Sequence, residues 1–428
     1  MRMAEVAEFQ RRVWEPDPAG LTRRDRRPCE YDTYLPDKLL ARNYLLTGET
    51  AADVVDAENA VTTLNVRANA LASTEVLARI LLRAESVASS RIEGLVVGPR
   101  RLLEAEVARE IDGATSDVTA AEVLANVDAM NRAIELSSEG VNITPDLLCD
   151  VHRSLLAGTA AEQFSGSFRK EQNWIGGSSF NPCSAAFVPP PPELVEDLVD
   201  DLCAFCNDDS LPAIAQAAIA HAQFETVHPF VDGNGRTGRA LVHMIMRRRG
   251  LAPRVQPPIS LVLATISSDY IEGLGAYRYE GESDSTQAVD GVNRWIALFA
   301  GACTRAVADA VGFEDWMREI EVEWRMRLGR VRRGSSVDLL LGLLPGAPVI
   351  TVGGASAMLG RSFAAVNNAV AVLVDVGILR QVNVGRRNRA FESAEVIEAF
   401  IGFEPQIASS VDDTRVERPV RPTPSRPR

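Results

Sequence analysis

Residues 226–239 read TVHPFVDGNGRTGR, and this stretch carries the strongest signal in the chain. His228 ends one helical pattern, Pro229 enforces a turn, and the run Gly233–Gly235 opens the next helix. The backbone N–H groups and the dipole at such a helix N-terminus form an anion site. Glycine lets a phosphate approach the backbone closely. The stretch therefore predicts a phosphate-binding turn between two helices.

Charged side chains surround this predicted anion site. Asp232 comes four residues after His228. Arg236 and Arg239 are three residues apart, so both can point toward one anion. A carboxylate beside a phosphate site predicts Mg²⁺, and a neutral histidine at the rim can take a proton from an attacking hydroxyl. A glycine-rich turn with solvated arginines explains GNG alone, but the full set within twelve residues favours phosphate chemistry.

Residues 228–239 match the motif HxFx(D/E)GNGRxxR of the Fic family at every fixed position. The chain therefore resembles Fic proteins, which are mostly adenylyltransferases that move AMP from ATP to a hydroxyl side chain of a target protein. The resemblance extends over roughly residues 30–400. It implies that ATP is the substrate, that Mg²⁺ is the cofactor and that the target protein has an accessible Ser, Thr or Tyr hydroxyl. It also implies that the protein modifies itself.

The resemblance gives each motif residue a role. It implies that His228 is the general base and that Asp232 is the Mg²⁺ ligand. Gly233, Asn234 and Gly235 would form the phosphate cradle, and Arg236 and Arg239 would each bind a phosphate oxygen. Arg239 would hold the γ-phosphate. Residues 174–192 look like the family's hairpin flap, two short strands around a polar turn, and its docking residues would be Ile175, Gly176, Gly177 and Phe187.

A second match lies upstream, where residues 89–94 read SSRIEG and fit the family's inhibitory motif (S/T)xxxE(G/N). Ser89, Glu93 and Gly94 occupy the fixed places. The pattern alone is weak, because a helix end capped by Gly94 explains it equally well. Within a Fic protein it implies autoinhibition: the Glu93 carboxylate would pair with Arg239, which could then not hold the γ-phosphate.

The sequence predicts a mainly α protein. We expect an N-terminal helical region carrying the inhibitory motif (1–112), a Fic core with its flap (113–330), a winged helix-turn-helix (335–403) and a disordered tail (404–428). Residues 1–50 look irregular because they are polar, rich in arginine and interrupted by proline. The apolar run 339–360 contains prolines and glycines, so we interpret it as a helix end, a loop and a new helix rather than a membrane span.

Composition limits the classes of partner. Apolar residues make up 46% and the net charge is −13, which excludes a disordered chain and a surface that coats nucleic acid or anionic membrane as a whole. Six scattered cysteines are too few for a disulfide framework, and the start of the chain lacks the apolar core of a signal peptide. We therefore expect a cytoplasmic protein with reduced thiols and no membrane partner.

Other interpretations stay open. The Fic core could remove AMP from a modified protein, or serve as a nucleotide sensor in a regulator that binds DNA through Arg386, Arg387 and Arg389 of the predicted wing. The winged helix could instead support a homodimer or dock the target. The remaining histidines, His152, His221 and His243, are expected to be packed or surface residues. Tyr270, Tyr277 and Tyr279 could line the adenine pocket or be modified themselves, but core or surface packing is the favoured interpretation.

Overall fold

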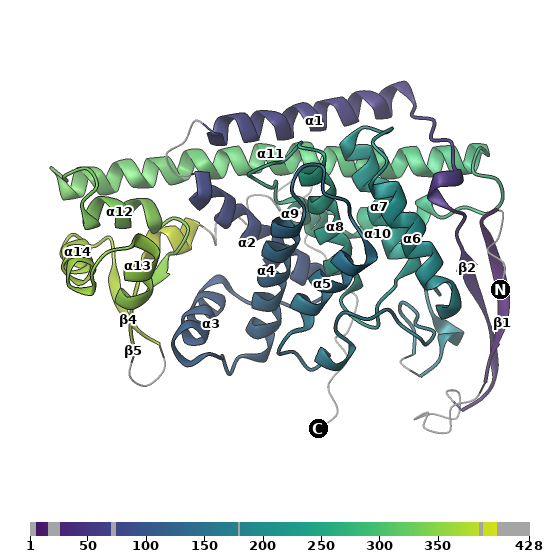
Figure 1. The fold of residues 1–428 in the computed structure, drawn as a ribbon, viewed down its shortest axis with the longest axis horizontal. Helices are drawn as coiled ribbons and strands as arrows, with labels where there is room; N and C mark the ends of the chain where they lie inside the picture. The colour runs from purple at the N-terminus through teal and green to yellow at the C-terminus, as the bar shows by residue number, and fades with distance from the viewer. Residues whose placement is uncertain (1–5, 16–25, 70–73, 179, 385–387, 400–428) are drawn as a thin grey trace. The chain divides into compact units, whose positions relative to one another are not determined.

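The computed structural model describes residues 6–15, 26–69, 74–178, 180–384 and 388–399 (Figure 1). The described chain is mainly helical, which confirms the predicted fold class. The helices are α1 (Gly48–Asn69), α2 (Thr74–Ile92), α3 (Pro99–Asp112), α4 (Val118–Leu136), α5 (Pro145–Leu156), α6 (Val195–Cys206), α7 (Ala213–Val227), α8 (Asn234–Arg248), α9 (Ile259–Thr265), α10 (Ser267–Tyr277), α11 (Thr286–Leu328), α12 (Ser336–Leu343), α13 (Val352–Leu359) and α14 (Phe363–Asp375). The strands are β1 (Glu8–Trp14), β2 (Cys29–Leu35), β3 (Val349–Ile350), β4 (Arg380–Val384) and β5 (Asn388–Glu392).

Two compact units share these elements, and each gathers three separate segments of chain. The first contains residues 1–62, 128–253 and 267–304, and the second contains residues 63–127, 254–266 and 305–428. The limits 1–112, 113–330, 335–403 and 404–428 stay predictions, and the proposed tail lies outside the described residues.

Local signals position the helices of the first unit. Thr144 caps α5 by accepting a hydrogen bond from the Leu147 N–H at 3.3 Å, and Pro145 takes the first helical position, as predicted. Just after the C-terminus of α8, Gly250 adopts a left-handed φ of 66°, which fits its expected role as a helix stop.

The pair α7 and α8 forms the centre of the first unit. All residues of α7 are buried. Gly238 on α8 allows the close approach, because a Cβ there would lie 2.7 Å from Glu225 Oε1 and 2.9 Å from Phe224 Cδ1. Trp295 of α11 packs against α7 and donates from its indole N–H to the Ala218 carbonyl at 2.7 Å. The site described below lies on the turn that joins these two buried helices.

The N-terminal segment is a β-hairpin, so the expectation of an irregular start was wrong. β1 pairs antiparallel with β2, with Arg11 opposite Asp32, and Figure 1 shows the two strands side by side. Arg11 Nε donates to Asp32 Oδ1 at 2.9 Å on the exposed face. Two of the arginines that suggested an irregular segment, Arg11 and Arg12, occupy strand positions, where alternating side chains point to opposite faces.

A disulfide ties this hairpin to the flap segment. Cys29, the first residue of β2, is bonded to Cys183, and their Cα atoms are 5.8 Å apart. This corrects the expectation of reduced thiols for these two residues, whereas Cys149, Cys203, Cys206 and Cys303 are free thiols. The cysteine count predicted no framework, but a single bridge between residues 154 positions apart leaves no local signal in a sequence.

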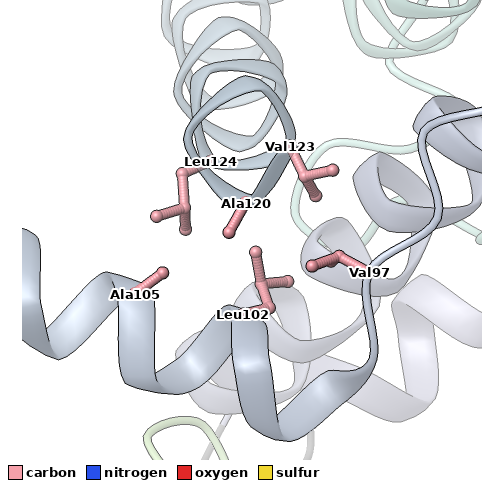
Figure 2. Close-up of a cluster of buried hydrophobic side chains, with 6 residues drawn as sticks. All are labelled: Val97, Leu102, Ala105, Ala120, Val123 and Leu124. Atoms are coloured by element: carbon pink, nitrogen blue, oxygen red, sulfur yellow. The ribbon is translucent and has the colours of Figure 1, made fainter. Parts of the chain in front are cut away.

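The second unit packs α3 against α4 and against the small sheet near the C-terminus. Figure 2 shows the first contact, a cluster of six buried side chains: Val97, Leu102, Ala105, Ala120, Val123 and Leu124. A second cluster joins α3 to β3 and β5 through Leu103, Val107, Val349, Ala390 and Ile397. Together the two clusters make α3 the central helix of this unit.

Three helices and a hairpin follow one another between residues 336 and 392, in the order predicted for a winged helix. The strand order is β3-β5-β4, and α13 and α14 meet at 115°. Thr351 and Ser362 cap these two helices with their side-chain oxygens. The run 339–360 is a helix end, a loop and a new helix, as predicted. DNA binding stays a prediction, because Arg386 and Arg387 lie outside the described residues.

One helix, α11, is long and apolar enough to pass for a membrane span. Half of its most apolar window is buried within the protein, which is also typical of a core helix. Trp295 and Phe299 on α11 are fully buried in the first unit. Packing inside the protein therefore accounts for the apolar side of this helix.

Replacing both bridged cysteines, Cys29→Ser with Cys183→Ser, is expected to lower the free energy of unfolding by about 2–4 kcal/mol. The cross-link restricts the unfolded chain over a long loop. Urea unfolding of protein prepared without reductant measures the loss. Cys149→Ser, at a cysteine outside the bridge, is the matched control. Equal stability of the double variant and the wild type would show that no bridge forms in solution.

Candidate active site

His228 lies at the C-cap of α7 with a left-handed φ of 48°. Among the described residues it is the one non-glycine with positive φ, a conformation that needs support from its surroundings. Its N–H donates to the Phe224 carbonyl at 2.8 Å. Its own carbonyl accepts from Arg169 Nε at 2.9 Å and Asn173 Nδ2 at 3.2 Å. The strained position of the predicted base is therefore held by hydrogen bonds on both sides.

The imidazole of His228 is partly exposed at the end of its helix. Its side chain is 19% exposed, and Nδ1 lies 3.9 Å from Oε2 of Glu225, one turn earlier on α7. At this separation the carboxylate acts on the ring electrostatically and not through a hydrogen bond. This placement agrees with the predicted role at the rim of an anion site.

Asn234 closes the turn between the two helices. Its Oδ1 accepts from the Phe230 N–H and its Nδ2 donates to the Phe230 carbonyl, both at 2.8 Å. The sequence predicted a phosphate contact for this residue, and the structure assigns its side chain to shaping the turn. Only its backbone N–H, at the first position of α8, points to the predicted anion site.

His152 of α5 packs against the turn between α7 and α8 and hydrogen-bonds to it. Its Nδ1 accepts from the Gly166 N–H at 3.0 Å, so Nε2 carries the proton and donates to the Asp232 carbonyl at 2.9 Å. Burial lowers the pKa of His152 to about 4, which keeps the ring neutral. The ring also stacks on Phe230, with centroids 3.7 Å apart. The packing role expected for His152 is confirmed, with a structural hydrogen bond that the sequence did not reveal.

Gly233 has to be glycine for two reasons. Its φ is 74°, and a Cβ would lie 2.8 Å from Leu155 Cδ2 of α5. The glycine thus lets the turn lie directly against α5. The phosphate cradle that the GNG run predicted stays a prediction.

Arg236 supplies the clearest sign of an anion site. Its side chain is only 5% exposed, and within the described residues neither Nε nor Nη1 has a hydrogen-bond partner. The nearest carboxylate oxygen, Asp232 Oδ1, is 3.7 Å from Nη2. A buried guanidinium with unused donors is costly unless a ligand satisfies them. Its position in the first turn of α8 fits a phosphate oxygen.

Arg239 lies one turn further along α8 and is also buried. Burial and the positive charge of Arg239 lower the pKa of His221 to about 3. His221 is therefore neutral, and its Nε2 lies 2.8 Å from the Tyr270 hydroxyl. Tyr277 and Tyr279 are buried as well, so the packing interpretation of these aromatic residues is confirmed.

Asp232 fits a metal that arrives with a nucleotide. Its side chain is 56% exposed beside Arg236, and Oδ1 also accepts from the Gly233 N–H at 2.6 Å. No three His, Cys, Asp or Glu side chains gather into a metal site anywhere in the described chain. Mg²⁺ commonly binds through one or two carboxylates together with substrate phosphates, and one exposed carboxylate at an anion site suits that arrangement.

The flap is shorter than predicted. Ile175 and Phe187 form a single antiparallel bridge instead of two strands. A 3-10 turn, Pro182–Ser184, fills the tip, and Gly177 packs so closely that a Cβ would lie 2.4 Å from the Ser184 carbonyl oxygen. The Arg278 guanidinium lies 3.5 Å over the Phe187 ring. Packing of the tip and of Phe187, rather than a long hydrogen-bonded ladder, holds the flap together.

The N-terminal hairpin covers one arm of this flap. The Tyr34 N–H of β2 donates to the Val188 carbonyl at 3.0 Å, and the Thr33 hydroxyl donates to the Pro189 carbonyl at 2.6 Å. Ile175 uses both its N–H and its carbonyl toward the second arm. The outward-facing groups of Trp174 and Gly176 therefore form the edge suited to a target strand.

The predicted inhibitory residues lie at the end of α2, in the second unit. Ser89 is fully buried in the last turns of this helix. The Gly94 N–H donates to the Arg91 carbonyl at 2.9 Å with a φ of 82°, so Gly94 is a helix cap as the alternative interpretation required. Glu93 lies in the exposed turn beside it. An inhibitory role for Ser89, Glu93 and Gly94 stays a prediction.

Comparison with known proteins identifies both helical regions. Residues 142–246 match the Fic/DOC family, and residues 51–135 match the Fic/DOC family N-terminal region. These parts of the chain are similar to the Fic/DOC family. A solved structure of a Fic family protein from Desulfovibrio desulfuricans G20 covers 82% of this chain and 97% of its own, with a TM-score of 0.50 and 19% identity, which shows a shared fold.

Curated relatives match part of this chain. Protein adenylyltransferase fic-1 of Caenorhabditis briggsae is 38% identical over 125 residues, which cover 28% of this chain and 23% of the relative. Protein adenylyltransferase Fic of Drosophila virilis is 30% identical over 228 residues, which cover 50% of this chain and 44% of the relative. The matched parts thus span less than half the length of these relatives.

Arg169, Asn173 and Glu225 are site residues that the sequence analysis missed. They flank the motif in space, but single charged or amide residues in a loop or helix give no pattern that distinguishes them from surface residues. His152 belonged to a cluster of histidines in the sequence, yet nothing local showed which partner it would meet.

Proposed function

We propose that this Fic protein is a protein adenylyltransferase that uses ATP and Mg²⁺. The observation that carries the proposal is Arg236, which is buried in the first turn of α8 with unused donors. It supplies a preorganised site for phosphate oxygens beside a histidine able to accept a proton. The names of the curated relatives support AMP transfer as the reaction.

His228 would take the proton from the target hydroxyl at Nε2. The hydroxyl oxygen then forms a bond to the α-phosphorus of ATP, the bond from that phosphorus to the bridging oxygen breaks, and pyrophosphate leaves. The α8 N–H groups and Arg236 hold phosphate oxygens, and Arg239 would hold the γ-phosphate. Mg²⁺ held by Asp232 would neutralise phosphate charge when bound.

A target protein would dock along Trp174 and Gly176 as an added strand. The second flap arm already bonds to β2, so the first arm is the edge left for a partner. Such backbone pairing fixes the register of the target without demanding one sequence. It would deliver the hydroxyl to His228 at a constant distance from the flap.

Regulation would act through Glu93. Glu93 and Arg239 are 146 positions apart, and a charge-assisted pair between them would remove the arginine from the γ-phosphate. ATP could still bind, but its α-phosphate would not be aligned for in-line attack. This is the autoinhibition that the upstream motif predicted.

Incubation with ATP labelled at the α-phosphorus is expected to label protein, whereas ATP labelled at the γ-phosphorus is not. His228→Ala should reduce this labelling by about 10²–10⁴-fold while ATP still binds, because only the base is lost. Filter-bound label and isothermal titration measure the two effects. Label from the γ position alone, or normal turnover of His228→Ala, would contradict the proposal. In the same assay, Asp232→Asn should weaken ATP binding only when Mg²⁺ is present.

Target binding is expected to slow amide hydrogen exchange at residues 174–177 and to leave Phe187 unchanged. The outward amides of Trp174 and Gly176 would gain partners, whereas the Phe187 N–H already donates to the Ile175 carbonyl at 3.3 Å. The protein most strongly labelled in the first experiment serves as the target, and mass spectrometry reads the exchange. Slower exchange confined to the second arm would rule out docking on the first.

Glu93→Gly is expected to raise self-labelling by about a hundredfold, because realigning the phosphates recovers a loss of that size. Combining Glu93→Gly with Arg239→Ala should abolish the gain, since the released arginine causes it. Glu139→Gly is the matched control, because Glu139 also lies in an exposed turn directly before a left-handed glycine, Gly140. Equal self-labelling by Glu93→Gly and the wild type would end the autoinhibition hypothesis and leave the catalytic one intact.

A further inference from the structure

Arg169 donates hydrogen bonds to five backbone carbonyls around the site. It is 3% exposed, and its backbone N–H donates to the Pro229 carbonyl at 2.9 Å. Its guanidinium donates to four further carbonyls, from Nε to His228 at 2.9 Å, from Nη1 to Glu171 at 3.2 Å, and from Nη2 to Pro190 at 2.5 Å and Val227 at 3.2 Å.

These four carbonyls belong to two different structures. Those of Val227 and His228 are at the C-terminus of α7, where carbonyls lack helical partners and the helix dipole is negative. Those of Glu171 and Pro190 lie on the chain just before and just after the flap bridge. One planar, charged group therefore joins the end of the catalytic helix to both legs of the flap.

Only a guanidinium can make this connection. It offers five donors in a rigid fork, whereas a lysine has three donors at a single point and a neutral amide has two. Burial lowers the pKa of Arg169 to about 10, so the group is still protonated at neutral pH. The charge is stabilised by carbonyl dipoles, among which the negative end of α7 is the strongest.

Asn173 strengthens the same connection. Its Nδ2 donates to the carbonyls of His228 at 3.2 Å and of Phe230 at 3.0 Å. It comes directly before the first flap arm in sequence. The His228 carbonyl thus receives two donors from residues 169–173, and these fix the peptide that holds the left-handed conformation of His228.

We propose that Arg169 is a positioning residue that places the His228 imidazole and the base of the flap in one frame. The proposal rests on the adenylyltransferase function proposed above. A target docked on the flap then presents its hydroxyl in register with the base. The phosphate cradle on α8 is built without Arg169, so the loss of this residue affects proton removal and target alignment but not ATP binding.

Arg169→Lys in the full-length chain tests the proposal. The single-turnover rate of self-labelling should fall by about 10–100-fold, because small misplacements of reacting groups cost rates of this order. The dissociation constant for ATP, measured by titration, should change less than about twofold. Arg169→Ala should regain part of the lost rate when millimolar guanidinium is added, which a general loss of stability would not show.

Arg248→Lys is the matched control. Arg248 is similarly buried, lies at the far end of α8, and donates to Asp209 Oδ1 at 2.5 Å and to the Asn207 carbonyl at 3.1 Å. Its replacement should lower the melting temperature and leave the self-labelling rate unchanged. If Arg169→Lys does not fold, Asn173→Ala removes one of the two donors to the His228 carbonyl and should lower the rate without changing ATP affinity.

Hydrogen exchange separates this proposal from the function on which it rests. In Arg169→Lys, residues 171–176 and 226–232 should both exchange faster, whereas in Arg248→Lys they should not. If the wild type transfers no AMP, the proposed function fails, and faster exchange of both segments still supports the connection. Unchanged exchange, or a self-labelling rate in Arg169→Lys equal to that in Arg248→Lys, would overturn the positioning role.

Discussion

The turn between α7 and α8 constrains everything that the site does. One helix must end and the next begin within a few residues, and the Asn234 side chain makes this possible by bonding both backbone groups of Phe230. The negative end of α7 and the positive end of α8 therefore lie next to each other. Arg169 satisfies the first, and the second is a helix N-terminus of the kind that attracts an anion. The turn is thus suited to an anion because of how it closes.

The buried polar side chains around this turn differ in whether their hydrogen-bonding groups are satisfied within the protein. His152 is buried with both ring nitrogens in hydrogen bonds, and its lowered pKa keeps it neutral. Arg169 is buried with its donors directed at carbonyls. Arg236 is buried with Nε and Nη1 unsatisfied in the described chain. Since unsatisfied buried donors are costly, this contrast identifies Arg236 as the side chain shaped for a ligand.

The N-terminal hairpin changes what the flap can offer to a target. β2 bonds to the second flap arm through Tyr34, and Cys29 is bridged to Cys183 at the flap tip. The flap is therefore the edge of a larger β-arrangement instead of an isolated hairpin. One arm is bonded to this hairpin, and in the proposed docking an incoming strand would use the other. A segment that looked irregular in sequence would then define the docking side.

The sequence by itself determined the helices and the chemistry of the motif. Local signals act over a few residues, so they can be recognised in the sequence alone. Examples are the helix cap Thr144, the helix stop Gly250 and the charged run 228–239. The tertiary structure alone decided which distant groups meet. Arg169 and His152 reach the turn from 59 and 80 positions away, and the bridged cysteines are 154 positions apart. Such contacts depend on packing, because the fold determines which polar groups are buried together and therefore which of them must hydrogen-bond to each other.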